Sequence, residues 1–456
     1  GLRRCLDAFT IALNQACDSR QRWYTSTQEL QLASLEFCAA CRSTLRLHVR
    51  VQRDTPTRLW MGAPSQETRS ANRLSSTRVP VVRAHVVTWK LPASALRIVG
   101  DVLSRVKSLR LDEEFDGDLR GATWPASLEE LIFRGTLKRS LQGVTWPVSL
   151  TTLKFWEVEK PLAGVSWPPS LQVLVFNGVM PNESISGVAW PLSLKRLHLR
   201  FGFNHPVDTI AWPPSLERLH LGYHFNQPIA GVRWPASLIE LSFGRAFNQA
   251  VDMATWPGLL QTIEFGSRFK QPLGGVQWPA SLQQLTLGSN FQHLAGGVAW
   301  PASLKQLIFG PCFNQPLAGV AWPPSLQRLR LGLEFNQAIV GVSWPDSLQE
   351  IIFSDDWDIS SVRERIKRPI SAREMSDLLS KFDQPITEVR WPPSLLRVSF
   401  GDGFHQPVDG VAWPASLREL AFGRSFRSPD GSFEWPASLQ QLTIARRPSE
   451  PLPSWP

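Results

Sequence analysis

The sequence predicts a mainly β solenoid: a stack of about fourteen coils of 22 residues, each with one short strand, the strands pairing into a parallel sheet, and a small helical cap at the N-terminal end. A tryptophan-containing motif recurs at a near-constant spacing, and apolar residues alternate once in each repeat. The 30 Gly and 37 Pro among 456 residues leave little room for long helices. A hydrophobic content of 43% supplies a large core and excludes disordered and collagen-like chains.

The repeat is marked by Trp-Pro-x-Ser-Leu or a close variant. Successive copies are 21 to 23 residues apart, with one step of 47 residues, and a degenerate copy is predicted at Trp89. The fourteen copies begin at Trp124, Trp146, Trp167, Trp190, Trp212, Trp234, Trp256, Trp278, Trp300, Trp322, Trp344, Trp391, Trp413 and Trp435. A fixed period of this length is typical of repeat architectures in which every unit has the same local structure.

One repeat describes one coil. In the copy from Trp322, apolar residues lie 4, 7, 9, 13, 17 and 20 positions after the tryptophan. The alternation at Leu329 and Leu331 predicts a strand with one buried face. Turns are predicted at the Gly after the strand, at Phe-Asn-Gln-Pro and at Gly-Val-x-Trp-Pro. Because a single coil cannot bury its own apolar face, the coils are expected to stack.

The repeated pattern resembles a known repeat family. The block Phe-Asn-Gln-Pro, at 225–228 and 313–316, is joined to P-x-S-L-x-x-L-x-F-G. This combination resembles the FNIP repeat, a relative of the leucine-rich repeats, over about 340 of the 456 residues. This chain has Trp-Pro where the family more often has Leu-Pro. The resemblance implies a leucine-rich-repeat-like solenoid that serves as a protein-interaction surface, with no catalytic residues to carry over.

Three regions are predicted. Residues 1–88 form an Arg-rich segment, partly helical or disordered; residues 89–446 form the solenoid; and residues 447–456 form a Pro-rich tail. Apolar spacing within residues 1–50 is compatible with helices, and a short helix is predicted over 93–107, before a strand at 109–111. The 47-residue step predicts an insertion at about 354–381 with a short helix over 372–381.

Charge is distributed unevenly along the chain. Residues 1–111 hold 18 basic and 7 acidic side chains, whereas residues 112–456 hold 30 and 32. The stretch 42–83 could contact acidic partners, nucleic acid or lipid, or it could be a leader or a solvated linker. Without interleaved aromatic residues, nucleic-acid binding is a weak hypothesis for this segment, and it is not expected for the near-neutral array. No apolar stretch is long enough to predict a membrane-spanning helix.

The sequence contains no complete metal-binding or catalytic motif. Cys38 and Cys41 form a lone C-x-x-C, and the second pair of a zinc ribbon is missing. The repeats contain no cysteine framework, which favours a reducing compartment and predicts an intracellular, cytoplasmic protein. The first residue is Gly1 rather than Met, which leaves open a start further upstream. No nucleophile elbow, phosphate loop, kinase signature or H-E-x-x-H motif is present, so we predict no enzyme activity, cofactor or metal.

The candidate binding site lies on the variable strand face. Residues six and eight positions after each tryptophan form a stripe along the sheet. Within it Arg196, His198, Arg218 and His220 form a cationic patch, which we expect to contact an acidic protein partner; the alternative is a solvated face. The candidate partner-binding residues are Lys195, Arg196, His198, Arg200, Arg218, His220, Arg328 and Arg330. The insertion is a second candidate contact region.

Two columns of repeated side chains have alternative readings. The tryptophans are predicted to stack as a core or rim column, the alternative being an exposed carbohydrate-binding ladder. The asparagines, such as Asn226 and Asn248, are predicted to form a hydrogen-bonding ladder.

These observations favour a non-catalytic protein-interaction scaffold or recognition module. The alternatives are an extracellular ligand- or glycan-binding array, and the repeat region of a larger protein such as a ubiquitin-ligase adaptor or a kinase.

Overall fold

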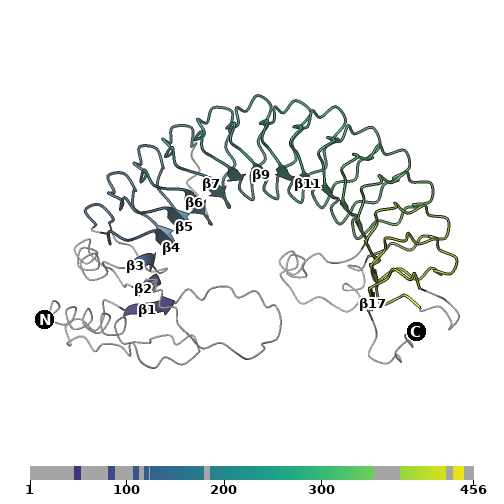
Figure 1. Cartoon of the computed structure of the whole chain (residues 1–456). Helices are drawn as coiled ribbons and strands as arrows, with labels where there is room; N and C mark the ends of the chain where they lie inside the picture. The colour runs from purple at the N-terminus through teal and green to yellow at the C-terminus, as the bar shows by residue number, and fades with distance from the viewer. Residues whose placement is uncertain are drawn as a thin grey trace, which may run out of the picture. The chain divides into compact units, whose positions relative to one another are not determined.

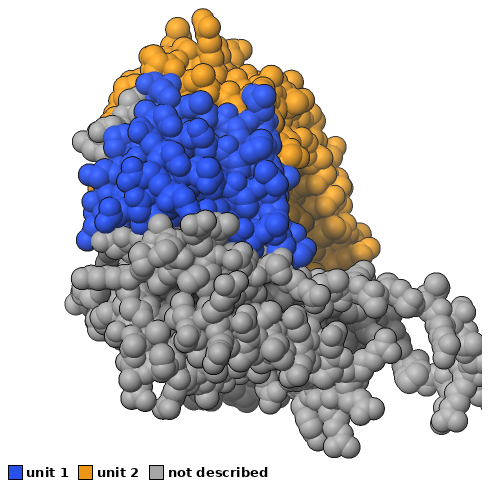
Figure 2. Space-filling model, turned by 90° about the vertical axis from the view of Figure 1, so that its left-hand side faces the viewer, with its two compact units in different colours: residues 1–194 blue, residues 195–456 orange. Residues whose placement is uncertain are grey.

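The computed structural model describes residues 46–52, 81–87, 106–111, 118–122, 124–178, 185–353, 380–427 and 435–445. The chain divides into two compact units, residues 1–194 and residues 195–456, coloured blue and orange in Figure 2. Strands and turns account for the regular structure of these ranges, and none of their residues is helical. Most residues of the predicted helices lie outside these ranges. Of the few that lie inside them, 46–50 and 106–107 belong to strands and 380–381 are irregular, so the helix prediction is wrong for them.

Unit 1 contains an antiparallel pair of strands followed by parallel ones. β1 pairs antiparallel with β2, and β2 through β6 then pair parallel in chain order. The strands are β1 (Arg46–Gln52), β2 (Val81–Val87), β3 (Val106–Leu111), β4 (Glu130–Leu137), β5 (Thr152–Val158) and β6 (Val173–Phe176).

Residues 1–88 were predicted to be partly helical or disordered, but β1 and β2 show that 46–52 and 81–87 are strands. Leu47, Val49 and Val51 alternate with polar residues, which is the period of a strand rather than of a helix. The same seven-residue length in β2 lets every residue of β1 find a partner, from Arg46 opposite Val87 to Gln52 opposite Val81. The remainder of residues 1–88 lies outside the described part of the chain.

Unit 2 is a regular stack in which each coil contributes one short strand. Consecutive strands pair in parallel and in register, so that each residue faces its equivalent in the next coil. Figure 1 shows these strands along one side of the coils and the turns on the other. The strands are β7 (Arg196–Leu199), β8 (Arg218–His220), β9 (Glu240–Ser242), β10 (Thr262–Glu264), β11 (Gln284–Thr286), β12 (Gln306–Ile308), β13 (Arg328–Arg330), β14 (Glu350–Ile352), β15 (Arg397–Ser399), β16 (Glu419–Phe422) and β17 (Gln441–Ile444).

Columns of equivalent apolar side chains form the core between the strands and the turns. The clearest column holds the phenylalanine 13 residues after each tryptophan, and its rings are fully buried from Phe225 through Phe335. Ring centroids of neighbours in this stretch are 5.9 to 6.3 Å apart, with interplanar angles of 2 to 18°. Near-parallel rings at this spacing gain aromatic contact in addition to burial of apolar area.

The Trp-Pro-x-Ser-Leu motif closes one turn and ties it to the preceding coil. The amide of Leu238 donates to the carbonyl of Pro235 at 3.1 Å, which is the hydrogen bond of a tight turn. The hydroxyl of Ser237 donates to the carbonyl of Leu216, one coil earlier, at 2.8 Å. The same serine bond recurs from Ser149 to Ser416, so the motif supplies one side-chain link between many successive coils.

The asparagine column is a hydrogen-bonding ladder, as predicted. The Oδ1 atom of Asn226 accepts the amide of Asn248 at 2.8 Å and the Nε2 of Gln249 at 3.1 Å. The column continues where Asp383 replaces Asn, since its Oδ1 accepts the amide of His405 at 3.0 Å. An acceptor oxygen is therefore sufficient to continue the ladder, whether an amide or a carboxylate supplies it, although Lys270 occupies the same position in one coil.

The 25 extra residues of the 47-residue step leave the sheet intact. β14 pairs with β15 in the usual register, with Ile351 opposite Val398. The coil resumes at Ser380, whose hydroxyl donates to the carbonyl of Phe353, and the amide of Lys381 donates to Leu333 at 2.7 Å. The insertion predicted at about 354–381 otherwise lies outside the described residues.

Candidate functional site

Two adjacent strands at the start of unit 2 bring most of the predicted site residues together. In β7 and β8 the leucines point into the core, so the intervening side chains project from the open face of the sheet. Parallel pairing places Arg196 opposite Arg218 and His198 opposite His220. Arg196 and Arg218 are exposed, while the two histidines are half-buried between them and the neighbouring rows.

The two histidines form a close pair that carries little charge at neutral pH. Their ring centroids are 4.1 Å apart, at an interplanar angle of 42°. Burial lowers the pKa of His198 to about 3, assisted by repulsion from His220, Arg200, Arg196 and Arg218. Burial also lowers the pKa of His220, although Glu240 and Glu264 act in the opposite direction. The arginines therefore supply the positive charge of this face.

Carboxylates from the next coils neutralise part of the predicted cationic patch. Glu240 of β9 lies 3.4 Å from Arg218 Nη1 and 3.4 Å from His220 Nε2, and Glu217 lies 3.1 Å from Lys195 Nζ. No carboxylate of the described residues is within ion-pair distance of Arg196 or Arg200. The sequence indicated which residues share the stripe, but not that glutamates would pair with half of its cations.

The other two predicted residues do not belong to this cluster. Arg328 and Arg330 lie on β13, six coils along the stack from β7, and Arg328 Nε is 3.4 Å from Glu350. That glutamate also lies 3.4 Å from Arg397 Nη1. The eight candidate residues are therefore divided between two separate places on the sheet face, with six at β7 and β8 and two at β13.

An aromatic pair beside the first cluster was missed by the sequence analysis. Phe201 follows Arg200 directly and is 45% exposed, and its ring stacks on Tyr223 of the next coil at 5.4 Å between centroids. The guanidinium carbon of Arg245 lies 5.4 Å from the centre of the Tyr223 ring. The signal was present in the sequence, because the equivalent position in the next three coils is occupied by Arg245, Ser267 and Ser289 rather than by an aromatic residue.

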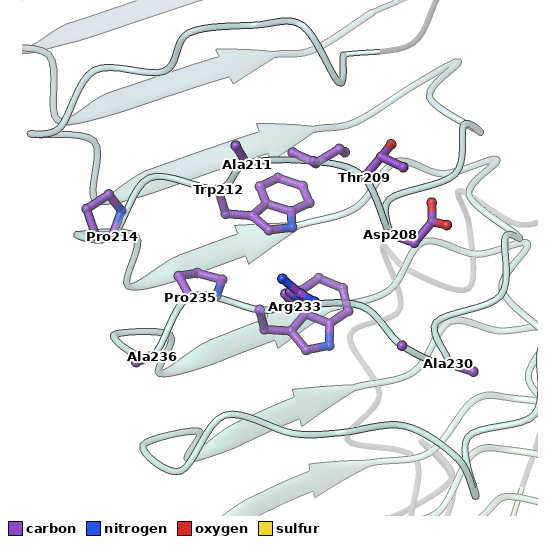
Figure 3. Close-up of a pocket in the computed structure, with 12 residues that line it drawn as sticks. Asp208, Thr209, Ala211, Trp212, Pro214, Ala230, Arg233, Pro235 and Ala236 are labelled. Carbon is purple, nitrogen blue, oxygen red and sulfur yellow. The ribbon is translucent and has the colours of Figure 1, made fainter.

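A pocket of about 800 Å³ lies away from this face, between the coils that begin at Trp212 and Trp234. Figure 3 shows the two indole rings, with Asp208 and Arg233 beside them. The rings are stacked at 6.2 Å with an interplanar angle of 21°, and only 9% of Trp212 is exposed. Stacking of Trp212 on Trp234 and the burial of Trp212 favour the predicted packing column over an exposed ladder on which a sugar stacks.

The described residues offer neither a metal site nor a membrane-spanning helix. No group of three or more His, Cys, Asp or Glu side chains in those residues could hold a metal ion. None of the described segments forms a helix long and apolar enough to cross a membrane. Cys38 and Cys41 lie outside the described part of the chain.

Comparison with known proteins agrees with this repeat geometry. The FNIP Repeat family matches residues 203–246 and 313–356, both within unit 2. FNIP repeats therefore lie at these two places in the chain. No curated protein matches the chain.

Solved structures place these FNIP repeats among leucine-rich-repeat solenoids. One is CroV588, a novel circular leucine-rich-repeat protein, which is 30% identical, with a TM-score of 0.59 over 75% of this chain and 50% of that one. Another is TLR13 in its complex with ssRNA13, which is 15% identical, with a TM-score of 0.52 over 79% of this chain and 56% of that one. The chain spans about half the length of both proteins. Such repeat solenoids are typical of protein-interaction modules, because stacking creates an extended surface.

Proposed function

We propose that the FNIP-repeat chain is a non-catalytic recognition module that binds a protein partner through the strand face of unit 2. The observation that supports this function is the cluster at β7 and β8, where Arg196 and Arg200 project from a rigid sheet without an acidic partner among the described residues. Exposed guanidinium groups on a fixed backbone suit bidentate recognition of carboxylates. Cytoplasmic residence and the absence of enzyme activity belong to the same proposal.

Affinity capture with the full chain tests this function. The bait is compared with an Arg196→Glu/Arg218→Glu variant, which reverses two charges on the exposed sheet face without touching the apolar columns. We expect the reversal to reduce capture of a specific partner by about tenfold or more, because exposed charges that match a partner control both attraction and fit. Partner capture that is unchanged by this reversal would contradict the proposed binding face.

Two further baits serve as comparisons. Arg418→Glu/Arg427→Glu changes two exposed cations near β16, outside the candidate site, and is the matched control. Deletion of residues 356–380 tests the insertion as the second proposed contact region. If only the deletion abolishes capture, the strand-face assignment is wrong and the insertion is the binding element.

A further inference from the structure

We propose that the partner segment recognised at the start of unit 2 is an acidic peptide carrying an aromatic side chain. The docking site is the arginine–aromatic surface, defined by Arg196, Arg200, Arg218, Phe201, Tyr223 and Arg245. This inference rests on the proposed function, since it names the chemistry of the partner that the strand face would bind.

The aromatic part of this surface is built by stacking between coils. Phe201 and Tyr223 occupy equivalent positions just beyond β7 and β8, and their rings are 24° from parallel at a centroid distance of 5.4 Å. The exposed fraction of Phe201, 45%, is large for a phenylalanine, since the phenylalanines of the core column are fully buried. An accessible aromatic shelf next to charged groups has the character of an interaction anchor.

Cations surround this shelf on the same side of the coils. Arg200 precedes Phe201 in the chain and lies close enough to His198 and His220 to lower the pKa of both histidines. Arg245 covers the Tyr223 ring and donates to its hydroxyl. No acidic side chain of the described ranges forms an ion pair with Arg196, Arg200 or Arg245, so their charges are available to a ligand.

The charge pattern favours a peptide over a nucleic acid. Glu217 and Glu240 lie within the cluster, paired with Lys195 and Arg218, and Glu264 lies near His220. These carboxylates would repel a continuous phosphate backbone, whereas a peptide can place its few carboxylates at the unpaired arginines. The exposed Phe201–Tyr223 pair would then contact an aromatic side chain of the peptide that lies between its carboxylates.

Fluorescence anisotropy with short labelled peptides tests the assignment. The probe is an alternating Glu–Tyr peptide of about eight residues, compared with Glu–Ala and Lys–Tyr peptides of equal length and with a single-stranded oligouridylate. For the full chain we expect the Glu–Tyr peptide to bind about tenfold more tightly than the Glu–Ala peptide, and the Lys–Tyr peptide not to bind measurably.

Two double variants separate the charged and aromatic contributions. Arg196→Glu/Arg200→Glu and Phe201→Ser/Tyr223→Ser should each weaken Glu–Tyr binding about tenfold. Arg418→Glu changes an exposed cation beside β16, outside the candidate site, and should leave this binding unchanged. Thermal unfolding of each variant shows whether its fold is kept. Arg196→Lys keeps the charge but not the bidentate guanidinium, so it should weaken Glu–Tyr binding less than the charge reversal does.

The outcomes distinguish this inference from the proposed function. Absence of Glu–Tyr binding, equal binding of Glu–Ala, or an equal loss in Arg418→Glu would overturn the inference. Tighter binding of oligouridylate with the same variant sensitivity would instead identify a nucleic-acid surface. If affinity capture still depends on Arg196 and Arg218 while the Glu–Tyr peptide fails to bind, the strand face remains the binding site and only the chemistry of the partner is wrong.

Discussion

Gly244 lies directly against the backbone of Gly222 in the preceding coil. A Cβ atom added to Gly244 would be 1.7 Å from the Gly222 carbonyl oxygen, and the same close approach repeats from Gly266 to Gly332. These glycines were predicted to form turns through conformational freedom. Their backbone angles are ordinary, and it is the neighbouring coil that excludes a side chain, whereas the turn glycines with positive φ, such as Gly341 at 78°, lie elsewhere in the repeat.

Gly266→Ala should therefore destabilise unit 2 strongly. The new methyl group would be 1.9 Å from the carbonyl oxygen of Gly244, a backbone atom that cannot move without shifting a whole coil. We expect a loss of about 3 kcal/mol or more in the free energy of unfolding, measured by urea denaturation. Gly274→Ala is the matched control, because nothing lies within 4 Å of its Cβ position and its φ is not positive. Equal stability of the two variants would show that the coils can separate at little cost.

The asparagine ladder predicts that the stability of the fold depends on a hydrogen-bond acceptor at position 226. Asn226→Leu removes the oxygen that accepts the Asn248 amide and the Gln249 side chain, and should cost about 2 kcal/mol in the free energy of unfolding. Asn226→Asp should retain most of the stability, because Asp383 already fills this role in the same column. Denaturation of the two variants side by side provides the measurement. A leucine variant as stable as the aspartate variant would mean that water replaces the ladder without loss.

The phenylalanine column should be the most sensitive apolar feature. Phe269 is fully buried, with its ring centroid 4.1 Å from that of Phe265 and about 6 Å from those of its column neighbours. Phe269→Ala is expected to cost about 3 to 5 kcal/mol, because the rigid stack cannot collapse around the cavity. Leu259→Ala, at a side chain that is 58% exposed, should change stability by less than about 0.5 kcal/mol. A small effect at Phe269 would argue that the coils repack freely.

The histidine pair predicts that unit 2 loses stability in acid. His198 has a pKa of about 3 in the folded chain against 6.5 for an ordinary histidine, so between these values the unfolded chain binds a proton that the folded chain does not. Its contribution to stability is complete above about pH 6.5, falls as the pH decreases through this window, and is lost towards pH 3. The groups that face the pair are Arg196, Arg200, Arg218, Glu240 and Glu264.

His198→Gln removes the titrating ring and tests this dependence. Urea denaturation at pH 7.5 and 4.5 should show a smaller acid-induced loss of stability for the variant than for the wild type. Because carboxylates also titrate in this range, the difference between the two proteins is the quantity that matters. Parallel losses in both proteins would show that the ring does not remain neutral in the folded state.

Much of this architecture could be predicted from the sequence because every repeat shows the same pattern of residue types. The position of each strand, the stacked Trp and Phe columns and the Asn ladder all follow from residue types recurring every 22 positions. The serine of the motif could not be explained in the same way, because its partner, such as Leu216 for Ser237, lies in another coil. Strands β1 and β2 lie outside the 22-residue repeat, so β1 could have been found only from the local alternation of Leu47, Val49 and Val51.

On the proposed binding face, the sequence predicted where the residues lie but not which of them form ion pairs. Arg196, His198, Arg218 and His220 were correctly placed in one row by counting from the tryptophans. Counting could not show which cations would be neutralised, because that depends on side-chain reach towards Glu217 and Glu240. The Phe201–Tyr223 shelf was overlooked because it lies beyond the strand, where the analysis of alternating residues stopped.

The join between Phe353 and Ser380 makes this coil a natural place to graft new sequence. The two ends of the excursion are held together by the Ser380 hydroxyl on the Phe353 carbonyl, and the strands before and after it pair as if the chain were continuous. Since the entropic cost of closing a loop rises only slowly with its length, a foreign domain whose own termini lie close together could be carried here. The solenoid would then hold the inserted domain at one fixed coil along its length.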